Sequence, residues 1–325
     1  MISVKNVSKY YGSVRAVENL SFEVKQGECV GFLGLNGAGK STVLQLLSCL
    51  LLPTSGRVTI SGFDVVDDSH EIRRFVGYLP EVPPLYPEMT TREYIEFAGR
   101  IRGLSRAQTN ERTRQVLEIC DLEKVEDSTI GTLSYGYKQR VGIAQAIVHS
   151  PRLLILDEPI QGLDPVQIVE MRKMIGELRG EHTILLSTHI LSEIEHTCDR
   201  ILMMQDGRIA AEGTEQELEQ RYGASRRIDL EVRGSEATLR SALASLSPNT
   251  LTHLSIEKGD SEILFVRLQV PEAAREQLSR AVVNAGLGLL SMKAETTGLE
   301  SIFVRLSALA VGSSSPPSPA SLQSE

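Results

Sequence analysis

The chain has 325 residues, enough for about two domains of ordinary size. Its 42 acidic and 34 basic residues give a net charge of −8, which argues against a general nucleic-acid binder with a basic face. The amino-terminal residues show no signal-peptide pattern, and the longest apolar runs, 46–52 and 153–156, are too short to cross a bilayer. The four cysteines lack metal-ligand spacing, which favours reduced thiols in a cytosolic protein.

The first part of the chain predicts an α/β domain over 1–223. Residues 2–7, 20–24 and 56–61 show the features of half-buried strands. Apolar runs at 75–79, 152–156 and 183–187 predict strands of a parallel sheet that is covered on both faces. Helices are expected at 166–179, 190–198 and 215–222. Asp206-Gly207 predicts a hairpin between 201–205 and 208–212.

A helical insertion is expected at about 82–135, where the character of the sequence changes. The segments 91–101 and 107–121 are amphipathic with a helical period, and prolines at 83, 84 and 87 mark the entry. The insertion interrupts the α/β domain between the strand at 75–79 and the strand at 152–156.

The composition shifts again at 223–225, after which a second domain is expected over 226–308. Its predicted order is strand 228–232, helix 236–246, strands 254–257 and 263–270, helix 271–285, strand 289–293 and helix 299–306. The βαββαβ part is typical of a small α+β ferredoxin-like domain. Pro271 and Gly286 suit the start and end of one helix, and Thr297 with Glu300 match a capping box. The Ser/Pro-rich tail 311–325 is expected to be disordered.

A phosphate-loop motif follows a short apolar run in the first domain. Residues 34–42 fit the pattern G-x-x-x-x-G-K-[ST], and the apolar residues after them have the spacing of one helix face. Backbone N–H groups in such a loop surround a phosphate, and the helix N-terminus favours the same anion. The expected phosphate-binding residues are Gly34, Leu35, Asn36, Gly37, Ala38, Gly39, Lys40, Ser41 and Thr42.

The motif also assigns individual roles. We expect Lys40 to reach the β- and γ-phosphates of ATP and the Ser41 hydroxyl to ligate Mg²⁺. A second acidic feature, Asp157-Glu158, ends the apolar run 153–156, so it would lie beside the phosphate loop at the edge of the sheet. Asp157 is then expected to hold Mg²⁺, and Glu158 to polarise the water that attacks the γ-phosphate. The alternative without a function is that Asp157-Glu158 forms a solvated acidic turn.

These residues and four further motifs resemble the ATP-binding subunit of an ABC transporter, from residue 2 to about 222. Residues 133–140, Leu-Ser-Tyr-Gly-Tyr-Lys-Gln-Arg, look like the family signature, and 162–165, Gly-Leu-Asp-Pro, look like its D-loop. Residues 187–189 end in the switch histidine, and 78–81 stand where the family has its glutamine loop. The resemblance implies a P-loop ABC ATPase core with an antiparallel β subdomain and a helical insertion.

The resemblance also implies roles for five more residues. Tyr11 would stack on adenine, with Tyr10 as the less favoured register. Glu81 would contact Mg²⁺ and the nucleotide, and His189 would bond the γ-phosphate. Ser134 and Gly136 would contact the γ-phosphate held by a second copy or a homologous ATPase, so that two subunits enclose two ATP molecules.

The sequence departs from the family pattern at three positions. Tyr135 replaces the first signature glycine, and Tyr137 replaces the glutamine. Glu81 replaces the usual glutamine, and a carboxylate cannot donate a hydrogen bond unless it is protonated. These variants resemble subunits that serve drug, polysaccharide and gliding-motility exporters, as does the segment 299–306. The branch therefore favours an exporter.

The leading functional hypothesis is an ATP-hydrolysing subunit that powers a separate integral-membrane permease, through which it sits at the cytoplasmic face of the membrane. The helical insertion would contact a cytoplasmic loop of the permease, and no nucleic-acid partner is expected. One alternative is a soluble ABC ATPase in a non-transport assembly. A nucleotide-binding regulator without hydrolysis is a further alternative, which Glu158 argues against. The role of the second domain stays open at this point.

Overall fold

The computed structural model describes residues 1–194, 197–222, 226–244, 252–259, 262–270, 274–295 and 302. The chain divides into two compact units, Met1–Thr214 and Glu215–Glu325. The domain limits predicted from sequence, 1–223 and 226–308, remain predictions. The expected tail 311–325 lies outside the described residues, as does all of the expected helix 299–306 except Ile302. In the part of the chain described, no helix is both long and apolar enough to cross a membrane.

The first unit contains a four-stranded antiparallel sheet in the order β2-β1-β4-β5. Its strands are β1 (Ile2–Tyr11), β2 (Val14–Val24), β4 (Ser55–Ile60) and β5 (Phe63–Asp64). Both β1 and β2 are longer than predicted and form one hairpin that turns at Gly12, where φ is +58°. The register of β1 shifts near Asn6, whose φ is +49°, so the alternating pattern does not extend along the whole strand.

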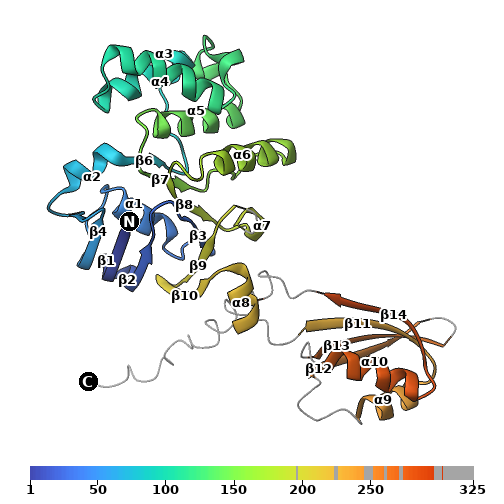
Figure 1. Cartoon of the computed structure of the whole chain (residues 1–325). Helices are drawn as coiled ribbons and strands as arrows, with labels where there is room; N and C mark the ends of the chain where they lie inside the picture. The colour runs from blue at the N-terminus through green and yellow to red at the C-terminus, as the bar shows by residue number, and fades with distance from the viewer. Residues whose placement is uncertain are drawn as a thin grey trace, which may run out of the picture. The chain divides into compact units, whose positions relative to one another are not determined.

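A six-stranded sheet forms the centre of the first unit, in the order β10-β9-β3-β8-β7-β6 (Figure 1). Its strands are β3 (Cys29–Leu33), β6 (Val76–Leu79), β7 (Leu153–Asp157), β8 (Thr183–Thr188), β9 (Arg200–Gln205) and β10 (Arg208–Gly213). Neighbouring strands are parallel, except that β9 and β10 form the antiparallel hairpin predicted at Asp206-Gly207. Both turn residues have positive φ, +47° and +75°, as a tight hairpin turn requires.

Both faces of the central sheet are buried, as the continuous apolar strands predicted. Alternate residues of β7 point to opposite cores: Ile155 joins the core that contains α1 (Lys40–Leu47) and the antiparallel sheet, whereas Leu156 joins the other. The second core is completed by α5 (Tyr135–Ile147) and α6 (Pro165–Glu177). The fold is therefore the α/β core with an antiparallel β subdomain that the motifs implied.

The helical insertion is present and contains α3 (Thr91–Ile101) and α4 (Arg106–Ile119), which stack beside α5 (Figure 1). Both α3 and α4 begin with capping boxes, Thr90 with Glu93 and Ser105 with Gln108. The sequence analysis did not predict α5 as a helix. Its residues 139, 141–144, 146 and 147 are all buried, which leaves no polar stripe to reveal the helical period.

Two further differences lie on shorter elements. The predicted strand 75–79 begins one residue late, because Phe75 is the last residue of an unpredicted helix, α2 (Ser69–Phe75). The predicted helix 190–198 is seen as α7 (Leu191–Ile194), and residues 195–196 lie outside the described part.

The second unit holds a four-stranded antiparallel sheet in the order β12-β13-β11-β14, with α9 and α10 contributing to its core. This βαββαβ arrangement is the ferredoxin-like fold that the sequence predicted. Gly286, with φ +75°, follows the end of α10 as expected, whereas Pro271, Thr297 and Glu300 lie outside the described residues. The elements are α8 (Glu215–Tyr222), β11 (Arg226–Arg233), α9 (Glu236–Ala244), β12 (Thr252–Lys258), β13 (Ile263–Val270), α10 (Arg275–Asn284) and β14 (Gly288–Glu295).

Candidate functional site

The phosphate loop connects β3 to α1, the strand–loop–helix context that the motif requires. Two glycines are needed for steric reasons. Gly39 has φ +98°, and a Cβ there would lie 2.4 Å from the carbonyl oxygen of Ala16. At Gly34, a Cβ would lie 2.7 Å from the carbonyl oxygen of Met204. Side chains at either position would force the loop away from its neighbours, so the glycines fix its shape.

Lys40 is the first residue of α1, and its side chain turns back over the loop. Its Nζ donates to the carbonyl oxygen of Gly34 at 2.7 Å and of Leu35 at 3.4 Å. The same ammonium lies 3.2 Å from Oε1 of Glu158, with both side chains almost fully buried. A buried cation beside bare loop N–H groups is a strong attractor for a phosphate anion.

Asp157 is the last residue of β7, which pairs with β8. Its carboxylate accepts hydrogen bonds from two hydroxyl groups. Ser41 donates to its Oδ1 at 3.1 Å, and Ser187, on β8, donates to the same oxygen at 2.5 Å. Burial raises the pKa of Asp157 above its usual range, and the carboxylates of Glu158 and Glu81 act in the same direction. The two hydroxyl groups partly oppose this shift, because they donate to the charged form.

The backbone at Glu158 is in the left-handed region, with φ +48°. Its N–H donates to the Ser187 hydroxyl at 3.0 Å, which supports this conformation. The side chain consequently diverges from that of Asp157 and lies between Lys40 and His189, whose Nδ1 is 2.8 Å from Oε2 of Glu158. A carboxylate between two nitrogen groups at the sheet edge can polarise a water molecule beside a phosphate.

A cavity of about 370 Å³ opens at this edge of the sheet. It brings Glu81, from the loop after β6, together with Glu158 and most of the phosphate loop. Its lining residues are Val14, Arg15, Ala16, Leu35, Asn36, Gly37, Gly39, Lys40, Ser41, Thr42, Glu81, Glu158 and Gln161. The predicted phosphate-binding, metal-binding and catalytic residues thus converge, with Asp157 and His189 in direct contact with members of this set.

Seven predicted residues are not among the lining residues. Four of them, Gly34, Ala38, Asp157 and His189, are hydrogen-bonded to residues that are, which leaves Tyr11, Ser134 and Gly136. Tyr11 is 45% exposed at the end of β1, where the Lys9 ammonium lies 5.3 Å from the centre of its ring. Ser134 is exposed at the start of α5 and accepts a hydrogen bond from the N–H of Tyr137, and Gly136 is buried against the side chain of Gln167. The single chain therefore does not bring Ser134 and Gly136 to its own phosphate loop.

The sequence analysis missed three polar residues of this neighbourhood. Ser187 contacts both Asp157 and Glu158, while Arg15 and Gln161 line the cavity. A hydroxyl residue at the C-terminal end of the apolar run 183–187 was a usable signal for Ser187, because neighbouring parallel strands end at one edge. Arg15 lies in the part of β2 that the alternation pattern did not reveal.

The residues present fit a magnesium ion. Among the described residues, no group of three His, Cys, Asp or Glu side chains could enclose a metal by itself. Mg²⁺ in nucleotide sites usually takes one or two carboxylates together with phosphate and water oxygens. Ser41 and Asp157, whose oxygens lie 3.1 Å apart, and the carboxylate of Glu81 near them offer that donor set.

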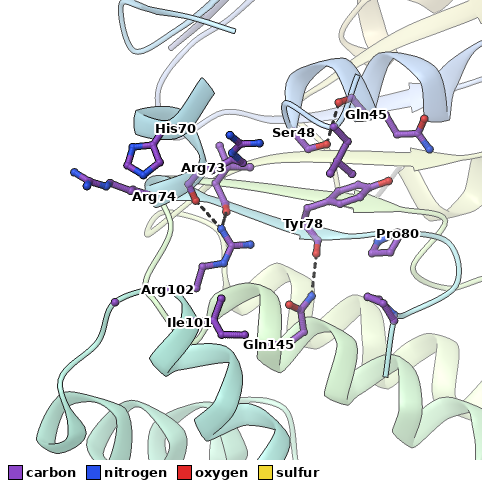
Figure 2. Close-up of a pocket in the computed structure, with 14 residues that line it drawn as sticks. Gln45, Ser48, His70, Arg73, Arg74, Tyr78, Pro80, Ile101, Arg102 and Gln145 are labelled. Atoms are coloured by element: carbon purple, nitrogen blue, oxygen red, sulfur yellow. Dashed lines mark hydrogen bonds between the residues drawn. The ribbon is translucent and has the colours of Figure 1, made fainter. Parts of the chain in front are cut away.

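A second hollow of about 740 Å³ lies between the core and the helical insertion (Figure 2). Arg73 from α2, Tyr78 from β6, Ile101 and Arg102 from the end of α3, and Gln145 from α5 line it. We call it the insertion groove; its other lining residues are Gln45, Ser48, Leu50, His70, Arg74, Val76, Pro80, Pro84 and Gly103.

The insertion groove combines apolar and positively charged surface. Ile101 is 67% exposed and Leu50 is 59% exposed. The Arg102 guanidinium donates to the carbonyl oxygens of Arg73, at 2.6 Å, and Val76, at 3.3 Å (Figure 2). Within the described part of the chain, neither Arg73 nor Arg102 forms an ion pair with a carboxylate. The groove therefore suits an apolar segment that carries an acidic side chain.

Comparisons with known proteins agree with this geometry. A family model described as "ABC transporter" matches residues 17–161. The chain is 44% identical over 220 residues, 68% of this chain and 73% of the relative, to the "Uncharacterized ABC transporter ATP-binding protein YxlF" of Bacillus subtilis. It is 36% identical over 309 residues, 94% of this chain and 96% of the relative, to the "Nod factor export ATP-binding protein I" of Burkholderia lata.

The fold is likewise similar to solved structures. One is the "Dimeric structure of a post-hydrolysis state of the ATP-binding cassette MJ0796 bound to ADP and Pi". It is 29% identical to this chain with a TM-score of 0.61, and the match covers 66% of this chain and 98% of that chain. The match thus spans nearly the whole of that ATP-binding cassette.

Proposed function

Since this chain belongs to the ABC transporter family as an ATP-binding subunit that hydrolyses ATP, we propose that it powers a separate membrane permease that acts as an exporter. The observation that carries the proposal is the convergence of Lys40, Asp157, Glu158 and His189 at one edge of the central sheet. The full-length similarity to a Nod factor export protein supports the direction of transport.

The proposed division of labour follows from the contacts. Lys40 binds the β- and γ-phosphates of ATP, since its buried ammonium already lies over the loop. Ser41 and Asp157 hold Mg²⁺, with Glu81 beside them. Bound there, the ion would neutralise charge on the β- and γ-phosphates. Glu158 orients and polarises the attacking water, and His189 holds Glu158 and bonds the γ-phosphate.

Three further roles are proposed on weaker contacts. Tyr11 provides an aromatic face for adenine, because its ring is exposed near the cavity residue Val14, its partner in the hairpin. Ser134 and Gly136 contact the γ-phosphate bound to a second copy or a homologous ATPase. The exposure of Ser134, away from its own phosphate loop, suits a contact made across such a dimer.

Light scattering tests the dimer with the Glu158→Gln variant, which should retain ATP because its hydrolysis is slow. We expect association with Mg-ATP and loss of association in Glu158→Gln/Ser134→Arg, because a long charged side chain would enter the interface. The same measurement is made on the assembled complex with the permease. The absence of a dimer in both the isolated protein and the assembled complex would contradict the proposal.

The insertion groove is the surface that we assign to the permease, which would hold the protein peripherally at the cytoplasmic face of the membrane. Arg73 and Arg102 give it two cations without a carboxylate partner in the described chain, and Ile101 supplies apolar surface. A short apolar segment of the permease with an acidic residue would bury Ile101 and pair with an arginine. Such a pair costs less desolvation at a half-open groove than in a closed core.

Membrane recovery with and without a permease tests this assignment. A candidate permease is to be sought among the neighbouring genes, co-expressed and detected independently. Wild type and Arg106→Glu, whose exposed position is outside the groove, should be recovered with membranes only when the permease is present. Arg73→Glu should lose recovery. If wild type and both variants stay in the soluble fraction with the permease present, the hypothesis of a non-transport assembly is favoured.

A further inference from the structure

Tyr135 occupies the position where the family signature has a glycine, and its hydroxyl has a buried partner. Nε2 of Gln139, one turn along α5, donates to the Tyr135 hydroxyl at 2.8 Å. The same Nε2 contacts the carbonyl oxygen of Glu81 at 3.4 Å. Because an amide nitrogen carries two hydrogens, Gln139 can hold both oxygens at once. Gln139 is completely buried, so losing either partner leaves a donor that water does not readily reach.

The rest of α5 packs closely against the segment that leads to Glu81. A Cβ at Gly142 would lie 2.6 Å from Cδ1 of Leu79 and 3.0 Å from Cβ of Pro83. Six residues after Gln139, Nε2 of Gln145 donates to the carbonyl oxygen of Tyr78 at 2.9 Å (Figure 2). The helix therefore contacts the segment from residue 78 to residue 83 at several points, of which Gln139 is the one at Glu81.

The ring of Tyr135 makes a second contact, with the loop that follows β7. Gly162 has φ +78°, and a Cβ there would lie 3.2 Å from Cε1 of Tyr135. Gly162 directly follows the turn in which the N–H of Gln161 donates to the carbonyl oxygen of Glu158 at 3.2 Å. Tyr135 thus touches one loop that carries Glu158 and, through Gln139, a second loop that carries Glu81.

We propose that Tyr135 is a positioning residue that fixes Glu81 through Gln139 and thereby sets the rate of ATP hydrolysis. The inference rests on the proposed place of Glu81 beside bound nucleotide. Its physical reason is that the Tyr135 hydroxyl fixes the orientation of the Gln139 amide, without which the long contact to the Glu81 carbonyl weakens. Tyr135 adjoins Ser134, so contact across the dimer at Ser134 is coupled to the carboxylate of Glu81.

Steady-state kinetics of Tyr135→Phe provide the test, since this change removes only the hydroxyl. We expect kcat to fall about fivefold, the factor that corresponds to one ordinary hydrogen bond, with KM for Mg-ATP within about twofold of wild type. Tyr86→Phe is the matched control, because Tyr86 is also a 47% exposed tyrosine but lies outside α5 and the cavity. Equal kcat for Tyr135→Phe and the control overturns the inference.

Two further variants identify the route of the effect. Gln139→Leu should lower kcat to a similar extent, and adding Tyr135→Phe to it should cause no further loss, because both changes break one chain of contacts. Tyr135→Phe should also have no effect in a Glu81→Ala background. Independent, multiplicative losses in either double variant overturn the inference. If Glu81→Ala alone has wild-type kcat, the proposed role of Glu81 fails first, which separates that outcome from a failure at Tyr135.

Discussion

The ammonium group of Lys40 lies 3.2 Å from Oε1 of Glu158, and both side chains are almost fully buried. The phosphate loop and the end of β7 are therefore joined by an ion pair at the point where a phosphate would bind. Any anion in the loop competes with Glu158 for Lys40, so nucleotide binding and the position of Glu158 are coupled. His189, at 2.8 Å from the other oxygen, keeps Glu158 partnered when Lys40 turns to a phosphate.

We predict that Lys40→Ala abolishes ATP hydrolysis and greatly weakens ATP binding, because a buried point charge on the phosphates is lost. The same change should also lower stability, since it leaves Glu158 without its cation. Removing one partner of a buried pair costs about 3–5 kcal/mol, and His189 should keep the loss near the lower end. Binding of a fluorescent ATP analogue, turnover and Tm measure the three effects.

A double variant separates binding from stability. Lys40→Ala/Glu158→Gln removes both charges of the pair, so its Tm should recover towards wild type while ATP binding stays weak. If Tm does not recover, the buried ion pair is not the source of the stability loss. Unchanged turnover in Lys40→Ala itself would contradict the whole reading of the loop.

Replacing Asp157 should have opposite effects on stability without metal and with Mg-ATP. Burial raises its pKa, so the folded state binds more protons than the unfolded state, and stability falls as pH rises from the ordinary aspartate pKa through the raised one. Above the raised pKa the ionised carboxylate is therefore a cost, although Asn could still accept from Ser41 and Ser187. Asp157→Asn should raise Tm in a metal chelator and lose most of the stabilisation given by Mg-ATP.

Thermal unfolding with EDTA and with Mg-ATP measures both halves of the Asp157 prediction. A ligand at 100 times its Kd contributes about 2.7 kcal/mol, so loss of Mg²⁺-dependent binding is easily seen. Glu177→Gln, an exposed helix position on α6, serves as the control for a general effect of removing an acid. A lower Tm for Asp157→Asn in EDTA would show that the Asp157 carboxylate does not destabilise the fold in the absence of metal.

Residue pattern alone predicted the phosphate loop, the acid pair and the covered parallel sheet, because each depends on contiguous residues. The strand at 153–156 and the loop at 34–42 are examples. Ser187 was missed because its role depends on β7 and β8 being neighbours, a long-range fact that one stretch of sequence does not contain. The helix α5 was missed because it is buried on many sides, which removes the amphipathic period.

The contacts of Tyr135 could not be predicted at all from spacing. Gln139 lies four residues after Tyr135, which is a helical spacing, but the helix itself had not been recognised. The Glu81 carbonyl lies 58 residues from Gln139 in sequence. The departures at Tyr135 and Glu81 were visible as single substitutions. Only the structure shows that they lie at two ends of one contact chain.

His149 should make the protein sensitive to mild acid. Burial lowers its pKa from 6.5 to about 4, and the nearby Arg102 cation acts in the same direction. The unfolded state therefore binds more protons between these two values, so stability is lost as pH falls from about 6.5 towards 4. At about 1.4 kcal/mol per pKa unit, the loss is a few kcal/mol.

His149→Gln should reduce this loss, because the amide cannot titrate but can still donate to the Val76 carbonyl, which lies 3.2 Å from Nε2 of His149. Tm measured from pH 7 to pH 4.5 should fall less steeply in the variant. His70→Gln provides the control, since the side chain of His70 is 75% exposed. Parallel pH profiles for wild type and His149→Gln would contradict the prediction.

Glu158 is predicted to separate ATP binding from ATP hydrolysis. Its left-handed backbone, held by the Ser187 hydroxyl, turns the side chain away from Asp157 and towards Lys40 and His189. Phosphoryl transfer needs little early proton abstraction, so the carboxylate acts mainly by orienting and polarising water. Glu158→Gln keeps the shape and removes the charge.

We expect turnover of the Glu158→Gln variant to fall about 10²-fold or more, with ATP still bound. The variant must be compared with Asp157→Asn for nucleotide retention and turnover, because Asp157→Asn should instead impair Mg²⁺-dependent binding. Turnover near the wild-type rate in Glu158→Gln would refute the catalytic assignment, and His189 would be the next residue to replace.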